Sequence, residues 1–189
     1  MPDHLFTTEL HLSDQHLNEV LTAEASAKKT KKVWGWTRQA QPYTDHTLKL
    51  AKLVGARFID IATGYLQCQQ QGRRLRMPHS NDVYDMEFSS IYLSAIKPGH
   101  SVNVPVSRGA LWRAVGWLQC DPESHRVSIQ PKTGIRPGPP GLYPNRHTIQ
   151  PEMQKVVFIP HGYNFDYAPG TSKNSTVLFL ANIIFKKTQ

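Results

Sequence analysis

Basic and aromatic side chains stand next to each other in two short stretches of this chain. Lysine and arginine neutralise phosphates, and aromatic rings stack on bases, so the combination is typical of a groove for single-stranded nucleic acid. The alternative is a set of lysines that keep a helix end soluble, with tryptophans that anchor the core. We predict nucleic-acid or anion contacts at Lys28, Lys29, Lys31, Lys32, Trp34, Trp36, Arg38, Arg73, Arg74 and Arg76.

The overall charge agrees with an anionic partner. The chain has 22 Lys and Arg against 14 Asp and Glu, a formal net charge of +8 over 189 residues. Such a balance favours nucleic acid, an anionic membrane surface or an acidic protein face. The longest apolar run, near Val177–Phe185, is too short to cross a bilayer. We therefore predict no membrane span, no signal peptide, and a cytoplasmic or virion location.

Motifs for catalysis or metal binding are missing from the sequence. Its nine histidines include no HxH, HxxH or HExxH pair, and there is no GxSxG, P-loop or GxGxxG. Cys68 and Cys120 lie in apolar runs without a feature that would lower a thiol pKa. Asp85 and Glu87 share one strand face, which suits an acid–base pair but equally a solvated surface. We predict no catalytic residue, no metal site and no cofactor, and we favour a protein that is not an enzyme.

Two helices are expected in the N-terminal part of the chain, before the residues typical of strands and turns begin at Ala56. Ser13 is a suitable N-cap for an amphipathic helix from residue 14 to about 27, and the lysines that follow suit its C-terminal end. A strand is expected before it. Thr44 or Asp45 would begin a second helix that Gly55 ends.

From Ala56 onward the sequence predicts strands and turns. The expected strands are Arg57–Gln69, Arg73–Met77, Val83–Ile96, Ser101–Val106, Ala110–Cys120, Arg126–Gln130, Lys155–Ile159 and Thr176–Lys186. Many short strands with turn residues between them indicate a mainly β fold, an antiparallel β-sandwich of jelly-roll-like type with one or two N-terminal helices. We divide the chain into an N-terminal strand–helix region, 1–55, and a β-sandwich body, 56–189, with a proline-rich loop at 134–144.

One short pattern occurs twice. Gly64–Cys68 reads GYLQC, and Gly116–Cys120 reads GWLQC, at an offset of 52 residues. Two equivalent hairpins in a pseudo-symmetric sandwich would explain the pattern. Coincidence between two similar segments would explain it equally well.

The stretch Ser90–Val115 combines a strand, a Pro-Gly-His turn, a Val-Pro pair and a strand with aromatic residues. It resembles part of a cupin motif. Cupins supply a histidine pair and a glutamate before this turn, whereas this chain has only His79 and Glu87. Where the later cupin histidine would stand, the chain has Ser107, Arg108 and Trp112. The resemblance therefore implies a jelly-roll backbone without the cupin metal site.

Three functions follow, in order of preference. The first is a non-enzymatic structural subunit of a larger assembly, such as a virion shell, penton or tail-type component, with a homo-oligomer or multi-subunit complex as its partner. The second is a single-stranded nucleic-acid-binding or RNA-processing protein. The third is a cupin-like enzyme that acts on a small molecule. We favour the first because it needs no motif that the sequence lacks.

Overall fold

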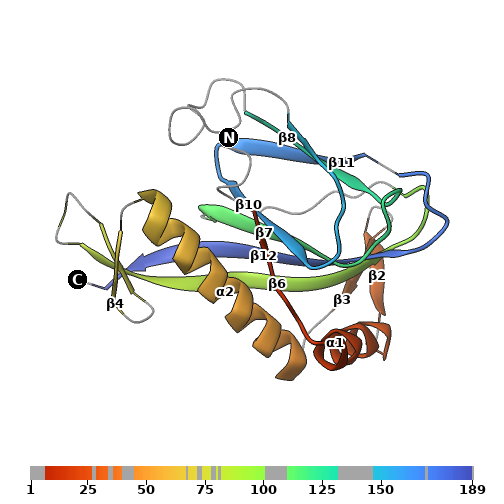
Figure 1. Cartoon of the computed structure of the whole chain (residues 1–189), viewed down its shortest axis with the longest axis horizontal. Coiled ribbons are helices and arrows are strands. Elements are labelled where there is room, and N and C mark those ends of the chain that lie inside the picture. Colours follow the sequence, from red (N-terminus) through yellow and green to blue (C-terminus); the bar gives the residue numbers. More distant parts are fainter. Residues whose placement is uncertain are drawn as a thin grey trace.

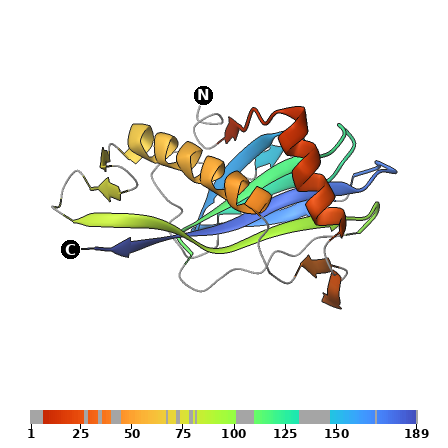
Figure 2. The same cartoon turned by 90° about the horizontal axis from the view of Figure 1, so that it is seen from below.

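Two antiparallel sheets and two helices make up most of this computed structural model. It describes residues 7–26, 29–33, 36–39, 45–66, 68–71, 74–77, 80, 82–100, 110–131, 147–168 and 170–188. The larger sheet has seven strands in the order β1-β10-β7-β12-β6-β5-β4, and the smaller sheet has three in the order β11-β8-β9. The smaller sheet lies over one face of the larger sheet (Figure 1), and Figure 2 shows both helices together on the other face. The prediction of a mainly β, antiparallel fold with N-terminal helices is confirmed.

The larger sheet consists of β1 (Thr7–Glu9), β4 (Gln69–Gln71), β5 (Arg74–Arg76), β6 (Val83–Ile96), β7 (Trp112–Gln119), β10 (Lys155–Pro160) and β12 (Thr176–Lys187). The smaller sheet consists of β8 (Arg126–Pro131), β9 (His147–Ile149) and β11 (Tyr163–Ala168). A separate hairpin joins β2 (Lys29–Val33) to β3 (Trp36–Gln39). The long central strand β12 pairs with both β6 and β7, and its register shifts once against each of them. Such irregularities bend a strand, and a bend allows the sheet to curl around its core.

The first helix, α1 (Asp14–Ser26), begins as predicted. The His16 amide donates a hydrogen bond of 3.2 Å to the Ser13 hydroxyl, which is therefore the N-cap. The helix ends at Ser26, within one residue of the predicted end, and Lys29, Lys31 and Lys32 of the following lysines lie in β2.

The second helix, α2 (Asp45–Leu66), corrects two predictions. It continues through Gly55, where we expected it to stop, and it occupies most of the segment predicted as the strand Arg57–Gln69. Its buried side chains recur at every fourth position, which is helical spacing: Leu50, Val54, Phe58 and Ala62. Because a glycine inside a helix costs only about 1 kcal/mol, the apolar face of α2 outweighs that penalty.

The strand predictions were more accurate in the second half of the chain. β6 has the predicted bounds, and β5, β7, β8, β10 and β12 agree within two residues at each end. The prediction did not include β9 or β11. The expected strand Ser101–Val106 and the proline-rich loop at 134–144 lie outside the described residues. Within the described part of the chain, no helix is long and apolar enough to cross a membrane.

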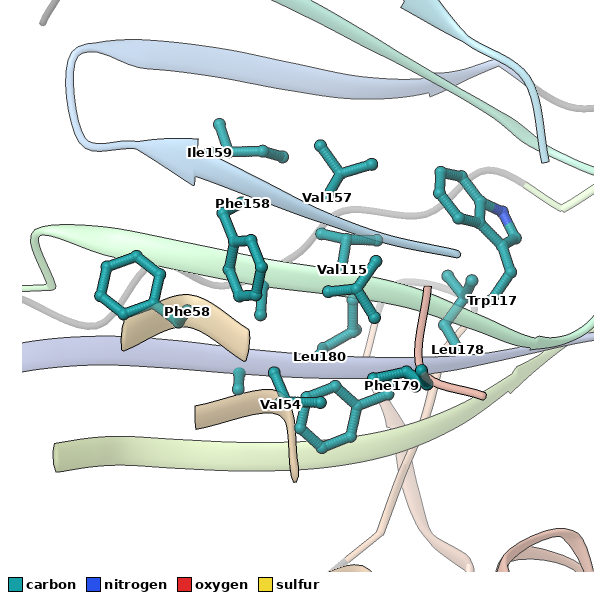
Figure 3. Close-up of a cluster of buried hydrophobic side chains, with 14 of the residues drawn as sticks. Val54, Phe58, Val115, Trp117, Val157, Phe158, Ile159, Leu178, Phe179 and Leu180 are labelled. Atoms are coloured by element: carbon teal, nitrogen blue, oxygen red, sulfur yellow. The ribbon is translucent and has the colours of Figure 1, made fainter. Parts of the chain in front are cut away.

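The hydrophobic core has two layers, one on each face of the larger sheet. On one face, Phe158 and Phe179 lie toward Phe58 and Val54 of α2 (Figure 3). On the other face, the core includes Trp117, and it extends to buried residues of the smaller sheet, Val127, Ile129, Ile149 and Tyr163. The larger sheet therefore has an outer face under the helices and an inner face toward the smaller sheet.

A polar network joins two loops at one end of the sheets. The carboxylate of Asp121 accepts hydrogen bonds from the Ser172 hydroxyl, from the Asn174 amide at 3.2 Å and from the Glu123 backbone N–H at 2.9 Å. These bonds, first among them the one from Ser172, hold the pKa of Asp121 below its ordinary value. The network connects the β7–β8 turn to the loop that leads into β12.

We expect this network to make stability fall in acid. A carboxyl whose pKa is lower in the folded state stabilises the fold above its unfolded pKa, near 3.9, and loses that contribution as the pH falls through the folded value. The Asp121→Asn variant should therefore lose less stability than the parent chain below about pH 4. Urea unfolding between pH 7 and pH 2 would measure the difference. The Ser172→Ala variant should raise the pKa of Asp121, seen in its carboxyl NMR titration, and an unchanged titration would contradict this account.

Candidate ligand site between the two sheets

A buried arginine lies on the face of β7 that is turned toward the smaller sheet. Arg113 lies on β7 beside Trp112, whose ring meets the Phe58 ring of α2 edge-on with centroids 5.5 Å apart. Successive side chains of a strand point to opposite faces, so Arg113 lies on the inner face. Trp117 shares that face, and its indole N–H donates to the backbone oxygen of His125, next to the smaller sheet, at 3.4 Å.

Five further polar side chains lie on the same inner face, on β6 and β12. We call the whole set the inner polar strip: Ser90, Tyr92, Ser94, Arg113, Thr176 and Asn182. Asn182 is paired in register with both Ser90 and Arg113, and its amide donates to the Ser90 hydroxyl at 2.7 Å. The strip therefore crosses three central strands, which gives it a rigid base.

Two hydroxyls of the strip have no hydrogen-bond partner. The oxygens of Ser94 and Thr176 are buried and unpaired. They lie near each other, because Ser94 is opposite Leu178 and Thr176 is opposite Ile96 on the paired strands. An unpaired buried hydroxyl destabilises a fold by about 1–3 kcal/mol, so such groups need an explanation. They lie four to six residues along the strands from the level of Arg113, so they form a separate polar spot on the inner face.

The strip carries a positive charge. Arg113 is only 7% exposed, and this burial lowers the pKa of its guanidinium. A guanidinium nevertheless remains protonated in proteins, so the charge stays in place at neutral pH. None of the six strip residues is acidic. Arg113 already has a contact within the protein, and its remaining N–H groups suit an anionic group that accepts hydrogen bonds.

The cysteines do not provide a nucleophile. Burial raises the pKa of the Cys68 thiol, and burial together with Asp121 and Glu152 raises that of Cys120 to about 11. Both are therefore thiols, not reactive thiolates, at neutral pH.

A separate hollow of about 400 Å³ lies on the outer face, between α2 and strands β4 and β6. Its walls are mostly apolar, with Lys52, Asp60 and Gln70 as the polar contributors. Gly55 lets the helix approach the sheet here, since a Cβ would come within 2.9 Å of the Met86 methyl group. This hollow lacks the buried charge and the unpaired hydroxyls of the inner polar strip.

The structure separates the two predicted nucleic-acid stretches. Residues of the first stretch lie in the β2–β3 hairpin, whereas Arg74 and Arg76 lie on β5, near the opposite end of β6 (Figure 1). Arg74 forms an ion pair of 3.1 Å with Asp85. Lys28, Trp34 and Arg73 lie outside the described residues. Binding of nucleic acid by either stretch stays a prediction, but the two stretches do not form one groove.

The sequence matches no protein-family model and no curated protein. The fold, however, is similar to solved structures over nearly the whole chain. SnoN from nogalamycin biosynthesis, a non-heme alpha-ketoglutarate-dependent epimerase, has a TM-score of 0.62 at 13% identity, covering 94% of this chain and 76% of SnoN. HygX from Streptomyces hygroscopicus, solved with nickel and 2-oxoglutarate bound, has a TM-score of 0.61 at 7% identity, covering 94% and 81%.

A third structure is an oxidoreductase of the 2OG-Fe(II) oxygenase family from Burkholderia pseudomallei. Its TM-score is 0.59 at 9% identity, and the match covers 96% of this chain and 85% of that one. These similarities show a shared fold. They overturn our first functional prediction: the structures with this fold are oxygenases and related enzymes, so the prediction of a structural subunit of a virion shell, penton or tail was wrong.

The described residues of this chain do not fit the iron site that such enzymes imply. Non-haem Fe(II) oxygenases hold iron with two histidines and one carboxylate. Among the residues that the structure describes, no three His, Cys, Asp or Glu side chains come together. The segments 101–109 and 132–146, which lie outside the described residues, contain none of these four residue types. We therefore assign no chemical step to iron in this protein.

Arg113 was absent from our sequence predictions. The available signal was a charged residue inside the apolar run LWRAVGWL, where burial on both faces predicts apolar side chains. A buried arginine in a central strand is uncommon, because charged side chains are almost never fully buried unless they are paired.

Proposed function

We propose that this protein binds a small organic acid between its two sheets, with Arg113 as the cationic contact. The observation that carries the proposal is the buried guanidinium of Arg113 on the inner face, with Asn182 directly opposite it in register and Tyr92 nearby. A guanidinium and a carboxylate form two parallel charged hydrogen bonds, which are among the strongest in proteins. The Asn182 amide, directly opposite Arg113, would add a neutral hydrogen bond to the same ligand.

The fold supports this choice of ligand class. In jelly-roll and barrel-type folds, a small ligand binds between the facing sheets. HygX was solved with 2-oxoglutarate, and SnoN is dependent on alpha-ketoglutarate, which is the same dicarboxylate. The proposal is close to the third function that we considered, a cupin-like protein acting on a small molecule. It differs in assigning neither a metal nor a reaction.

Calorimetric titration with 2-oxoglutarate and succinate tests the proposal. We expect both acids to bind the parent chain, and the uncharged dimethyl ester of succinate to bind at least about tenfold more weakly. The Arg113→Met variant should lose about ten- to hundredfold in affinity, since a hydrogen bond to a charged group contributes about 1.5–3 kcal/mol. The matched control is Lys52→Met, which removes a cation from the hollow on the outer face. If Lys52→Met rather than Arg113→Met abolishes binding, the site is wrong.

Two further variants separate binding from folding. Thr176→Val removes an unpaired hydroxyl while keeping the shape of the side chain, so it should leave stability unchanged or raise it by about 1 kcal/mol. Because Thr176 lies six residues along β12 from Asn182, the residue opposite Arg113, the same variant should leave acid binding unchanged. Arg113→Lys keeps a charge but loses the planar fork, and we expect it to bind more weakly than the parent chain and better than Arg113→Met. Equal binding by all variants would refute the proposal.

A further inference from the structure

We infer that this protein holds the acid group directly on Arg113 and carries no two-histidine, one-carboxylate iron centre, although it shares the fold of iron-dependent enzymes. The inference rests on the proposed function for the ligand, but its metal part stands on separate observations. It predicts ligand binding that is independent of metal ions, on a fold whose solved relatives are described with iron or nickel.

The first argument concerns the histidines. His125 is buried, and its Nε2 lies 2.6 Å from the backbone oxygen of His100, so this ring connects two loops. His11 lies at the surface beside Glu9, with 3.7 Å between Nδ1 and the carboxylate. None of the six residues of the inner polar strip is a histidine or carries a carboxylate. The inner face thus offers hydroxyl, amide and guanidinium groups, which are poor ligands for Fe(II).

The second argument concerns the side chains that the structure does not describe. The His, Cys, Asp and Glu residues among them are Asp3, His4, His46, His79 and Asp166. Asp3 and His4 are adjacent, and the other three are far from them and from one another along the chain. His46 lies in the first turn of α2, which packs on the outer face, whereas Asp166 is paired with Ser128 in the smaller sheet. These two residues therefore belong to elements on opposite sides of the larger sheet.

The third argument is electrostatic. A divalent cation on the inner face would share a space of low polarity with the charge of Arg113. Like charges repel strongly in such surroundings unless carboxylates lie between them. None of the six strip residues supplies a carboxylate that would hold a metal ion beside this charge, so the strip disfavours a metal ion. The same guanidinium that would attract an organic acid thus works against the metal.

Titration of the full chain with Mn(II), followed by electron paramagnetic resonance, tests the metal part directly. We expect no stoichiometric site, and only weak, fractional binding by surface histidines. One tight Mn(II) site per chain would overturn the inference. If such a site is found, the His79→Ala and Asp166→Asn variants would show whether it uses side chains outside the described residues.

Titration with 2-oxoglutarate in EDTA and again with excess Mn(II) tests the ligand part. We expect the two affinities to agree within about twofold, because Arg113 binds the acid without a bridging ion. An affinity more than tenfold higher with Mn(II) would overturn the inference and leave the proposed function intact. No binding under either condition, together with no Mn(II) site, would refute the proposed function and leave the absence of the iron centre standing.

Discussion

Replacing Phe58 with alanine is expected to lower the free energy of unfolding by about 3–5 kcal/mol. Phe58 is 1% exposed and lies in the middle of α2. Its ring meets those of Trp112 at 5.5 Å, Phe158 at 5.2 Å and Phe185 at 6.0 Å, which come from three different strands of the larger sheet. Truncation would leave a cavity under the helix and remove all three ring contacts at once.

Urea unfolding followed by circular dichroism would measure this loss. The matched control is Leu48→Ala, in the first turns of the same helix, where the side chain is 40% exposed. Because little of Leu48 is removed from water, we expect its truncation to change stability by about 0.5 kcal/mol or less. A loss below about 1 kcal/mol for Phe58→Ala would mean that α2 does not pack on the sheet as described.

The same helix shows where reading the sequence fails. The segment after Gly55 contains alternating and adjacent apolar residues, Phe58, Ile59 and Ile61, so a short window suggests a strand. Only a longer window, which includes Leu50 and Val54, shows the four-residue spacing of the buried face. We gave too much weight to Gly55 as a signal for the end of the helix. The packing of a long apolar face against a sheet overrides such a local preference.

The repeated pattern makes the same point more directly. Gly64–Leu66 of the first copy lies in the last turn of α2, whereas Gly116–Gln119 of the second copy lies in β7. The two copies therefore are not equivalent hairpins, and the pattern is a coincidence. In β7, Gly116 is next to Val156 and Phe179 of neighbouring strands, whereas nothing lies within 4 Å of the position where a Cβ of Gly64 would stand. Tertiary surroundings, which the sequence does not display, decided between helix and strand.

The candidate site was harder to predict than the fold. Strands such as β6 and β12 are visible in the sequence because β-branched and aromatic residues cluster between turn residues. The inner polar strip is assembled from β6, β7 and β12, which are distant in sequence and become neighbours only when the sheet forms. The lysines and tryptophans attracted attention because they are contiguous in the sequence. A single buried arginine did not, although it is the residue on which the proposed function depends.

The second large effect is expected at Gly170, in the loop between β11 and β12. A Cβ at this position would overlap the backbone oxygen of Glu123 and lie 2.5 Å from that of Ser124. Both atoms belong to the β7–β8 turn, which is held by the Asp121 network, and Ser172 also donates its backbone N–H to Glu123 at 3.0 Å. Backbone atoms cannot move aside as a flexible side chain can, so an added methyl group must force the two loops apart.

We therefore expect Gly170→Ala to lower the free energy of unfolding by about 3 kcal/mol. Gly64→Ala is the matched control, since it adds the same methyl group to open space inside a helix and should stabilise the chain by about 0.5–1 kcal/mol. Urea unfolding of both variants would give the two differences with opposite signs. If Gly170→Ala is as stable as the parent chain, the β7–β8 turn and the loop before β12 do not touch. The Asp121 network would then lose its structural basis, whereas the inner polar strip, which depends on the central strands, would not be affected.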